Sequence, residues 1–273
     1  QPRVAVRVDA SDAVAGARVF RRAVAPVYLR RNQEDVLTEL PGKIEVEDWV
    51  QHSPADEAAY KDAVRSRNLM QMRQAAFRSR DSAKLGRLAE IVEEAGEDGM
   101  KVVVFSYFLG VLEAVGQRLG ASVLGTITGA VPPMLRQQMV DDFRRHHGHA
   151  VLLAQIEAGG VGINMQAASV VVITEPQWKP STEDQAVARA HRMGQVRTVQ
   201  LHRLLAKDSV DERMQEIQQG KRLLFNEFAR KSEAKDADVR AVDAAEHRPS
   251  ILDDDTVPLE RRIILAEEHR LMG

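Results

Sequence analysis

A short segment with two arginines and one glutamine is the strongest candidate for chemistry in this sequence. In PSTEDQAVARAHRMGQ (180–195), Gln185, Arg189 and Arg192 are spaced i, i+4 and i+7. This spacing predicts that all three side chains share one face of a helix over 181–192. The two cations would repel each other by about 0.2–0.5 kcal/mol, and an anion on this face would reverse that effect. Arginine is suited to forked contacts with phosphate oxygens, so the segment favours a phosphate site.

Other interpretations of this segment stay open. The arginines could form a solvated basic face or pair with local carboxylates. Ser181 or Thr182 can cap the helix, and Thr182 with Gln185 could form a capping box, which would give Gln185 a structural task. The stretch from Arg189 to Lys207 holds five Lys or Arg and no Asp or Glu. It is compatible with a module that clamps nucleic acid or docks a partner without turnover.

A glycine-rich turn is the second candidate. Gly159, Gly160 and Gly162 stand in AGGVGIN (158–164), directly after an apolar run. Glycines let the backbone approach a ligand closely and expose N–H donors to an anion. A tight turn of a Rossmann-like unit is the alternative, because the full dinucleotide fingerprint is absent. Ligands of open parallel sheets gather outside the carboxyl ends of the strands, and this turn follows such an end.

Several other clusters of residues resemble the sequence motifs of functional sites. Asp56 and Glu57 imitate an acidic Mg²⁺ motif, but no buried strand precedes them, so we expect a helix-capping patch. His146, His147 and His149 are expected to be solvated loop histidines rather than a metal site. The sequence contains no G-x-x-x-x-G-K-[ST] phosphate loop, which argues against a free-standing nucleotide enzyme.

The elements that must position these candidates alternate along the chain from residue 101. Apolar, β-branched runs predict strands, and amphipathic stretches between them predict helices. The predicted strands cover 101–107, 122–128, 150–156, 168–174 and 198–205, and the helices cover 109–119, 132–146 and 181–192. Runs that are apolar at nearly every residue suit strands buried on both faces. We therefore expect an α/β domain with a mainly parallel sheet covered on both sides.

The flanking segments carry local signals of their own. We expect a strand over 43–51, a long helix from Pro54 to about Phe77, a helix over 83–95 capped by Ser82, a helix opened by a Ser209–Glu212 capping box and running to about Arg230, and a last helix over 258–272. The charged stretch between the last two helices has the composition of a linker.

Composition narrows the class of protein. The 273 residues are 44% hydrophobic with a formal net charge of −2, so a folded domain is expected and any nucleic-acid contact must come from a local patch. The absence of cysteine excludes a disulfide scaffold, a thiol nucleophile and a Cys-based zinc site. The longest apolar stretch, Val102 to Leu112, is too short to span a bilayer. Because the chain begins with Gln1 rather than Met, we expect it to be part of a longer protein.

Together these segments resemble the C-terminal RecA-like lobe of SNF2-family ATPases in helicase superfamily 2, from about Phe20 to Arg230. The resemblance is nearest to bacterial SNF2-type DEAD/DEAH-box helicases. Four segments stand in the family's order: PVYLRRNQEDVLTELPGK (26–43) is similar to the bridge between lobes, KVVVFSY (101–107) to motif IV, EAGGVGINMQAASVVVITEPQWKP (157–180) to motif V with its extension, and QAVARAHRMGQ (185–195) to motif VI.

The resemblance implies roles for individual residues. Arg189 and Arg192 match the motif VI arginines that reach the nucleotide phosphates, and Gln185 matches the motif's glutamine. The residues on the nucleotide side of motif V would be Gly162 and Asn164. The residues at the DNA would be Thr128, Gly129, Gly159, Gly160, Trp178 and Lys179, although Trp178 could equally be a packed tryptophan.

The resemblance also implies an architecture and partners. We expect an inter-lobe connector (1–42), a helicase C-terminal RecA-like domain (43–230), a linker (231–256) and a C-terminal helix (257–273). The N-terminal RecA-like lobe, which would carry the phosphate loop and hold Mg²⁺, is missing from this sequence. The implied ligands are ATP with Mg²⁺ and double-stranded DNA, with no membrane partner, in a cytoplasmic, nucleoid-associated protein. We expect the isolated chain to be inactive in ATP hydrolysis.

Three positions depart from the family's pattern. Gln155 and Glu157 stand where Ser and Lys are common before the motif V glycines, and Lys179 stands where Asn is usual. A carboxylate near a DNA phosphate is unfavourable, so Glu157 predicts a weaker or rearranged grip on DNA. Lys179 adds a positive charge at the same edge.

Overall fold

The computed structural model describes residues 42–158, 163–192, 195, 197–233 and 257–272. The chain divides into a larger unit, Glu39–Gln218 with Pro249–Gly273, and a smaller one, Gln1–Thr38 with Gln219–Arg248. Of the smaller unit, the described residues are 219–233, the later part of helix α10 (Val210–Glu233). Except for Gly42 and the helical residues 231–233, the predicted connector and linker lie outside the described residues, so these boundaries stay predictions.

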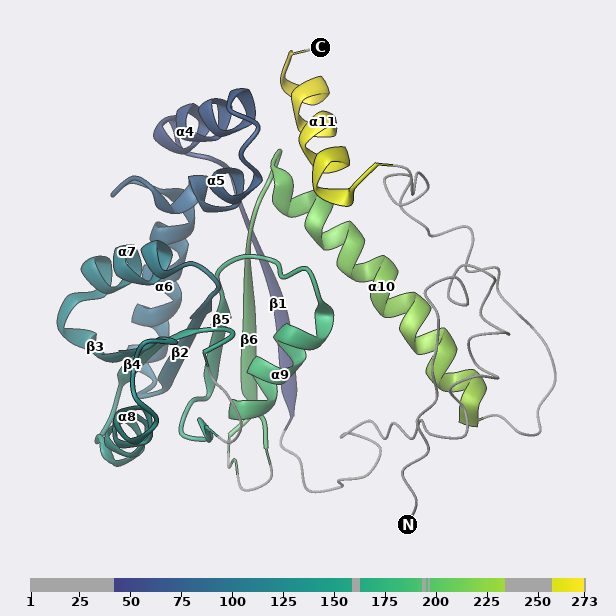
Figure 1. Cartoon of the computed structure of the whole chain (residues 1–273). Coiled ribbons are helices and arrows are strands. Elements are labelled where there is room, and N and C mark those ends of the chain that lie inside the picture. The colour runs from purple at the N-terminus through teal and green to yellow at the C-terminus, as the bar shows by residue number, and fades with distance from the viewer. Residues whose placement is uncertain (1–41, 159–162, 193–194, 196, 234–256, 273) are drawn as a thin grey trace. The chain divides into compact units, whose positions relative to one another are not determined.

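Six parallel strands form the sheet of the larger unit (Figure 1). Their order is β1-β6-β5-β2-β4-β3. The strands are β1 (Lys43–Val50), β2 (Lys101–Ser106), β3 (Val123–Ile127), β4 (Ala150–Gln155), β5 (Val170–Ile173) and β6 (Val199–Ala206). Every predicted strand is present to within two residues at each end, and the predicted α/β class with a parallel sheet is confirmed.

Helices cover both faces of this sheet. Alternate residues of the central strands enter opposite hydrophobic clusters: Val103 packs on the side of α8 and α9, and Val104 on the side of α6 and α7. Each such fully buried aliphatic side chain contributes about 1.5–3 kcal/mol relative to exposure. The helices are α6 (Ala83–Glu97), α7 (Leu109–Leu119), α8 (Pro133–Arg145) and α9 (Pro180–Ala190), with a short 3-10 turn η2 (Gly120–Ser122) before β3.

A third hydrophobic cluster joins helices distant in the sequence. It contains side chains of α4 (Pro54–Arg65), α5 (Leu69–Gln74), the start of α10 and α11 (Leu259–Met272). The hydroxyl of Tyr60 on α4 donates to the buried carboxylate of Glu267 on α11 at 2.8 Å, and it accepts from Val210 N at 2.7 Å. The last helix therefore packs on the lobe.

The prediction of one long helix from Pro54 to Phe77 is wrong, because the first helix ends at Arg65. Arg67 adopts a left-handed conformation (φ 53°), and Asn68 caps α5 by accepting from Gln71 N at 3.0 Å. The segment therefore forms α4, α5 and the short 3-10 turn η1 (Ala75–Phe77). The signal that predicts this break is Asn68, since asparagine tolerates turns and caps helices.

Two predicted caps differ in detail. The Ser82 hydroxyl does not cap its own helix; it donates to Asp56 Oδ1 at 2.6 Å, and the other Asp56 oxygen accepts from Ala83 N at 2.8 Å. Asp56 also closes a capping box with Ser53, so its predicted capping role is confirmed. At α10, Ser209 Oγ accepts from Asp211 N, while Glu212 reaches Asp208 N rather than Ser209 N. The start of α6 is thus capped by an acid from another helix, and the start of α10 by the hydroxyl of Ser209.

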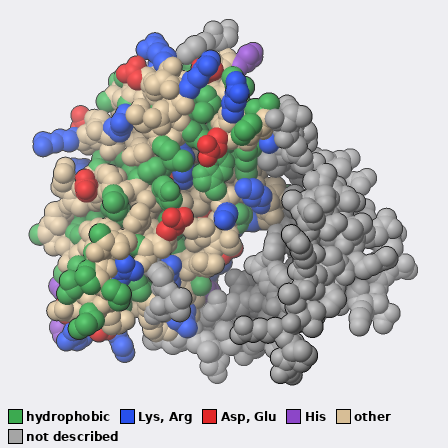
Figure 2. Space-filling view, viewed as in Figure 1, with side chains coloured by type: hydrophobic (Ala, Val, Ile, Leu, Met, Phe, Trp, Pro, Cys, Tyr) green, Lys and Arg blue, Asp and Glu red, His purple; other side chains and the backbone are tan. Residues whose placement is uncertain are grey.

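One face of the lobe is mixed in charge (Figure 2). On the face shown in Figure 2, Lys and Arg side chains lie among Asp and Glu rather than in one continuous field. Among the described residues, no helix is long and apolar enough to cross a membrane. An anion site on this face must therefore be a local arrangement of side chains.

Candidate functional site

Helix α9 begins before the point where a cap by Ser181 or Thr182 would have started it. Lys179 occupies the N-cap position without a side-chain cap, and Pro180 stands at the first turn. Proline suits this position because its missing N–H would be unpaired there anyway. Thr182 N donates to Lys179 O at 3.0 Å. The predicted cap is therefore wrong, and Gln185 is not part of a capping box; its side chain is exposed.

A buried acid fixes the amino end of α9. Glu183 is fully buried and accepts from Gln177 N at 3.0 Å, from Arg203 Nε at 3.0 Å and from Gln218 Nε2. Arg203 also donates to Glu45 on β1 at 2.7 Å. Burial lowers the pKa of Arg203, but the charges of Glu183 and Glu45 outweigh it and raise the pKa overall. This network ties α9 to two strands and was missed by sequence reasoning.

The carboxyl end of α9 corrects the expected one-face geometry. The helix ends at Ala190, and His191 turns the chain with a ψ of 86°. Arg192 therefore lies on an exposed bend beyond the helix, and the i, i+7 spacing does not place it on the helical face. Gln185 and Arg189 do remain one turn apart on α9.

The guanidinium group of Arg189 has incomplete hydrogen bonding. Its Nη1 atom is buried and has no hydrogen-bond partner among the described residues. The guanidinium lies over the ring of Phe105, 6.0 Å from the ring centre, and burial lowers the pKa of Arg189. Neither Arg189 nor Arg192 forms an ion pair with a described carboxylate, so the alternative of local pairing does not hold there. An incoming anion would complete the hydrogen bonding of Arg189.

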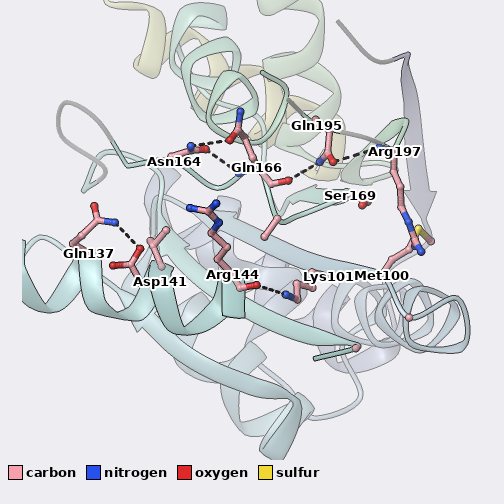
Figure 3. A pocket seen from close by; sticks show the side chains of 14 residues that line it. Met100, Lys101, Gln137, Asp141, Arg144, Asn164, Gln166, Ser169, Gln195 and Arg197 are labelled. Carbon is pink, nitrogen blue, oxygen red and sulfur yellow. Dashed lines mark hydrogen bonds between the residues drawn. The ribbon is translucent and has the colours of Figure 1, made fainter. Parts of the chain in front are cut away.

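The loop before β5 meets α9 through its backbone. Met165 N donates to Arg189 O at 2.9 Å. Exposed Asn164 forms a local turn: its Oδ1 accepts from Gln166 N at 3.1 Å, and its Nδ2 donates to Gln166 Oε1 at 2.9 Å (Figure 3). The predicted residues Gly159, Gly160 and Gly162 lie outside the described residues. The structure thus brings the Asn164 loop to the helix that carries Arg189.

The turn after β3 is occupied by protein contacts. Gly129 N donates to Gln155 Oε1 at 3.1 Å, and Gln155 Nε2 donates to Tyr107 O at 3.3 Å. Gln155 thereby ties together the carboxyl ends of three strands, β2, β3 and β4. Thr128 next to this turn is partly buried, whereas Glu157 beyond β4 is exposed. The departure at Gln155 therefore has a structural consequence: its side chain accepts the hydrogen bond of the Gly129 N–H.

Arg136 of α8 braces the same edge. It donates to three backbone carbonyls: Val131 O at 2.6 Å, Ala158 O at 2.7 Å and Gly129 O at 2.8 Å. The turn after β3 and the start of the glycine-rich turn are thus held by one guanidinium. Sequence reasoning missed Arg136, and its only signal was a basic residue in the first turn of a predicted helix.

Trp178 and Lys179 lie side by side in sequence but differ in surroundings. Trp178 is half-buried and packs against the third hydrophobic cluster, which supports the packed alternative. Lys179 is exposed where α9 begins.

A second buried acid was missed at the end of β5. Glu175 is 1% exposed and accepts from Tyr107 N at 2.7 Å, Ser106 Oγ at 2.9 Å, Gln177 Nε2 at 2.9 Å and Thr174 Oγ1. These donors satisfy the carboxylate without a cation. It joins the ends of β2 and β5 and so helps to fix the strand-end loops. Over the described part of the chain, no cluster of His, Asp or Glu could hold a metal ion. His146 and His147 are exposed as expected, whereas His149 is partly buried, with its Nδ1 2.7 Å from Met100 O.

A cavity of about 570 Å³ opens at the amino ends of β2 and β5, the edge opposite to the glycine-rich turn (Figure 3). Asn164 and Gln195 line it, and Gln195 Nε2 donates to Gln166 O at 2.8 Å and Ala168 O at 2.7 Å. Most of the basic side chains that line the cavity already donate hydrogen bonds to backbone carbonyls. Lys101 Nζ, for example, donates to Arg144 O at 3.0 Å. The two hydrogen bonds of Gln195, the last residue of the segment 180–195, connect it to the loop that contains Asn164.

Comparisons with known proteins match this fold and these segments. The family described as the helicase conserved C-terminal domain matches residues 83–194. An uncharacterized ATP-dependent helicase from Mycoplasma pneumoniae is 31% identical over 235 residues, covering 76% of this chain and 23% of that protein. The Sulfolobus solfataricus SWI2/SNF2 ATPase core domain aligns with a TM-score of 0.59 and 22% identity, over 82% of this chain and 54% of the other. This chain contains the helicase C-terminal domain of the SNF2 family.

The SNF2 match accounts for the fold. The C-terminal domain of the Sulfolobus ATPase aligns with a TM-score of 0.54 and 19% identity, over 77% of this chain and 96% of that domain. The predicted RecA-like lobe is therefore confirmed as an architecture. The chain spans about a quarter of the length of the Mycoplasma helicase.

Every predicted site residue falls inside the segment that matches the helicase family. Among the described ones, Arg189 and Asn164 are brought together by the Met165 contact, and Thr128 and Gly129 lie at the carboxyl edge of the sheet. The functional roles of these residues in an SNF2 motor stay predictions.

Proposed function

We propose that this chain is the second motor lobe of a DNA-dependent SNF2-type ATPase or translocase, in which Arg189 and Arg192 act on the terminal phosphates of ATP. One observation carries the proposal: Arg189 Nη1 is buried without a hydrogen-bond partner among the described residues. A buried donor left unpaired costs about 1–3 kcal/mol. A phosphate oxygen would remove that cost.

The residues of α9 have complementary tasks in this proposal. The backbone contact from Met165 and the ring of Phe105 orient Arg189 before any nucleotide arrives. Arg192, on its exposed bend, can reach outward to a second phosphate oxygen. Exposed Gln185 lies one turn before Arg189 and supplies a neutral donor. Such preorganised cations stabilise negative charge that develops on a transferring phosphoryl group.

The rest of the ATP site belongs to another lobe. ATP with Mg²⁺ supplies the phosphates, and an N-terminal RecA-like lobe with a phosphate loop holds them, since this sequence has no such loop. On this lobe, Gly162 and Asn164 face the nucleotide. The exposed side chain of Asn164 and its tight turn with Gln166 suit a residue that positions backbone near a ligand.

Duplex DNA is the proposed track, gripped through its backbone. Thr128, Gly129, Gly159 and Gly160 would approach phosphates from the carboxyl edge of the sheet, with Lys179 adding charge nearby. Because Gly129 N already donates to Gln155, we expect weak DNA binding by the isolated lobe. The affinity should fall steeply with salt, as phosphate contacts release counterions. We accordingly place the protein in the cytoplasm at the nucleoid.

A clamp without turnover is the alternative, and its support is weaker. That hypothesis rests on the basic stretch from Arg189 to Lys207. Arg203 in this stretch is buried and paired with Glu183 and Glu45, so it does not contribute to a basic surface. A passive clamp also gives no reason for the unpaired Nη1 atom of Arg189.

The test is DNA-stimulated ATP hydrolysis by the full-length two-lobe protein carrying Arg192→Ala. We expect turnover to fall at least about 100-fold, as for loss of a transition-state donor, with DNA affinity largely unchanged. Arg145→Ala, which removes an exposed arginine paired with Asp142, is the matched control and should retain turnover. Normal turnover by the Arg192 variant would end this assignment.

The isolated chain gives an independent check. We expect no measurable steady-state ATP turnover from it, with or without duplex DNA, because the phosphate loop is absent. A phosphate-release assay at saturating ATP measures this directly. Robust turnover that copurifies with the chain through several columns would contradict the composite site.

A further inference from the structure

A second cavity, of about 400 Å³, lies between the turn that precedes α6 and the later part of α7. Its lining includes Arg78, Arg80 and Arg118 and no carboxylate. Buried Phe77 and Leu85 form its apolar wall. None of these residues belongs to the proposed nucleotide or DNA site, so the cavity is a separate feature of the lobe.

The turn that carries two of the arginines is fixed by buried polar groups. Ser79 N donates to Ser82 Oγ at 3.0 Å, and Ser82 N donates to Ser79 O at 3.2 Å. Ser82 in turn donates to the fully buried carboxylate of Asp56 at 2.6 Å. The backbone of Arg78 and Arg80 is therefore held in place before any ligand binds, which lowers the entropy cost of binding.

The three guanidinium groups are unpaired, unlike several other exposed arginines of the lobe. Arg78, Arg80 and Arg118 are exposed, and none forms an ion pair or side-chain hydrogen bond with a residue that the structure describes. By contrast, three exposed arginines elsewhere pair with nearby acids: Arg65 with Asp62, Arg67 with Glu268 and Arg145 with Asp142. Three cations facing one concavity without a counter-charge favour an anionic ligand.

We propose that this cavity binds phosphate groups, with Arg78 and Arg80 contacting them from the fixed turn and Arg118 from the end of α7. Arginine suits this task because its planar fork donates to two phosphate oxygens at once. The phosphates can belong to a free oligophosphate or to the backbone of a nucleic acid. The site is independent of Arg189 and of ATP turnover.

The test compares two triple variants of this chain. Arg78→Gln/Arg80→Gln/Arg118→Gln removes the cavity's charges, and Arg65→Gln/Arg67→Gln/Arg145→Gln removes the same total charge from paired positions. Binding of inorganic tripolyphosphate is measured by calorimetry, and binding of a short DNA duplex by fluorescence anisotropy over a series of salt concentrations. Thermal unfolding of both variants verifies that the fold is kept.

We expect the cavity variant to lose about tenfold or more in affinity for at least one probe, and the control to change less than about threefold. Loss for tripolyphosphate alone assigns a free oligophosphate; loss for DNA, with a salt dependence shallower by about 0.9 for each contact removed, assigns the nucleic-acid backbone. Equal losses in both variants, or none in either, would overturn the proposal. Should the triple variant unfold, Arg80→Gln and Arg118→Gln alone, on separate elements, must each weaken binding for the proposal to stand.

Discussion

The two ends of α9 place arginines in opposite surroundings. At the amino end, Arg203 contacts two carboxylates, those of Glu183 and Glu45. At the carboxyl end, Arg189 packs on Phe105 with one nitrogen buried and no acceptor among the described residues. The pKa of the first is raised by its acids despite burial, and the pKa of the second is lowered by burial.

This contrast separates a structural arginine from one that awaits a ligand. Both lie on or against the same helix and both are partly removed from water, so burial alone does not distinguish them. The difference is whether the lobe supplies the counter-charge itself. Where it does, the ion pair joins elements of the fold; where it does not, the missing anion must come from outside.

The largest effect is expected on stability at the amino end. Arg203→Met leaves the buried Glu183 carboxylate without its cation and should lower the free energy of unfolding by about 3–5 kcal/mol. Urea unfolding followed by circular dichroism measures this change. The double variant with Glu183→Gln should lose less than the sum of the single variants, because the uncompensated charge is gone.

Arg145→Met is the control for this prediction. It breaks an exposed pair with Asp142 and should change stability by less than about 1 kcal/mol. If Arg203→Met lowered the free energy of unfolding no more than this control does, Arg203 would not be the structural arginine that we contrast with Arg189.

A smaller, pH-dependent effect is expected at Glu45, the outer partner of Arg203. Burial raises the pKa of Glu45, but hydrogen bonds from Lys43 and Arg203 outweigh it and lower the pKa to about 2. The pKa of an unfolded glutamate is about 4.3. The ionised group therefore stabilises the fold above that pH, and this contribution is lost as the pH falls toward 2. Because Glu45 is half-exposed, the gain is below about 1 kcal/mol.

The measurement is urea unfolding of the wild type and Glu45→Gln across acidic and neutral pH. At pH 7 the variant should be slightly less stable, and the gap should close as the pH falls below about 4. A gap that is constant over this range would mean that the charge of Glu45 does not stabilise the pair with Arg203.

Much of the fold was predictable because its strands are buried on both faces. Runs such as Val102–Phe105 and Val170–Ile173 are apolar at every residue, and their alternation with helices indicates a parallel sheet. Prediction failed where local polar chemistry decides the path. The left-handed Arg67 with the Asn68 cap breaks a helix whose hydrophobic pattern continues across it.

The candidate site was predictable in residue identity but less so in geometry. Spacing located Gln185 and Arg189 on one helix, but it could not locate the turn at His191 that carries Arg192 off that helix. The buried acids Glu175 and Glu183 were missed because their partners come from strands and helices distant in the sequence. Such networks depend on tertiary packing, which a local pattern does not encode.

In the function proposed above, Arg189 serves a nucleotide phosphate and not the fold. Arg189→Met keeps an unbranched apolar stem against Phe105 and removes the guanidinium. In the full-length protein, we predict that DNA-stimulated ATP turnover falls at least about 100-fold while the free energy of unfolding changes by less than about 1 kcal/mol. A variant that keeps its turnover, or that loses turnover only because the lobe unfolds, would contradict the claim.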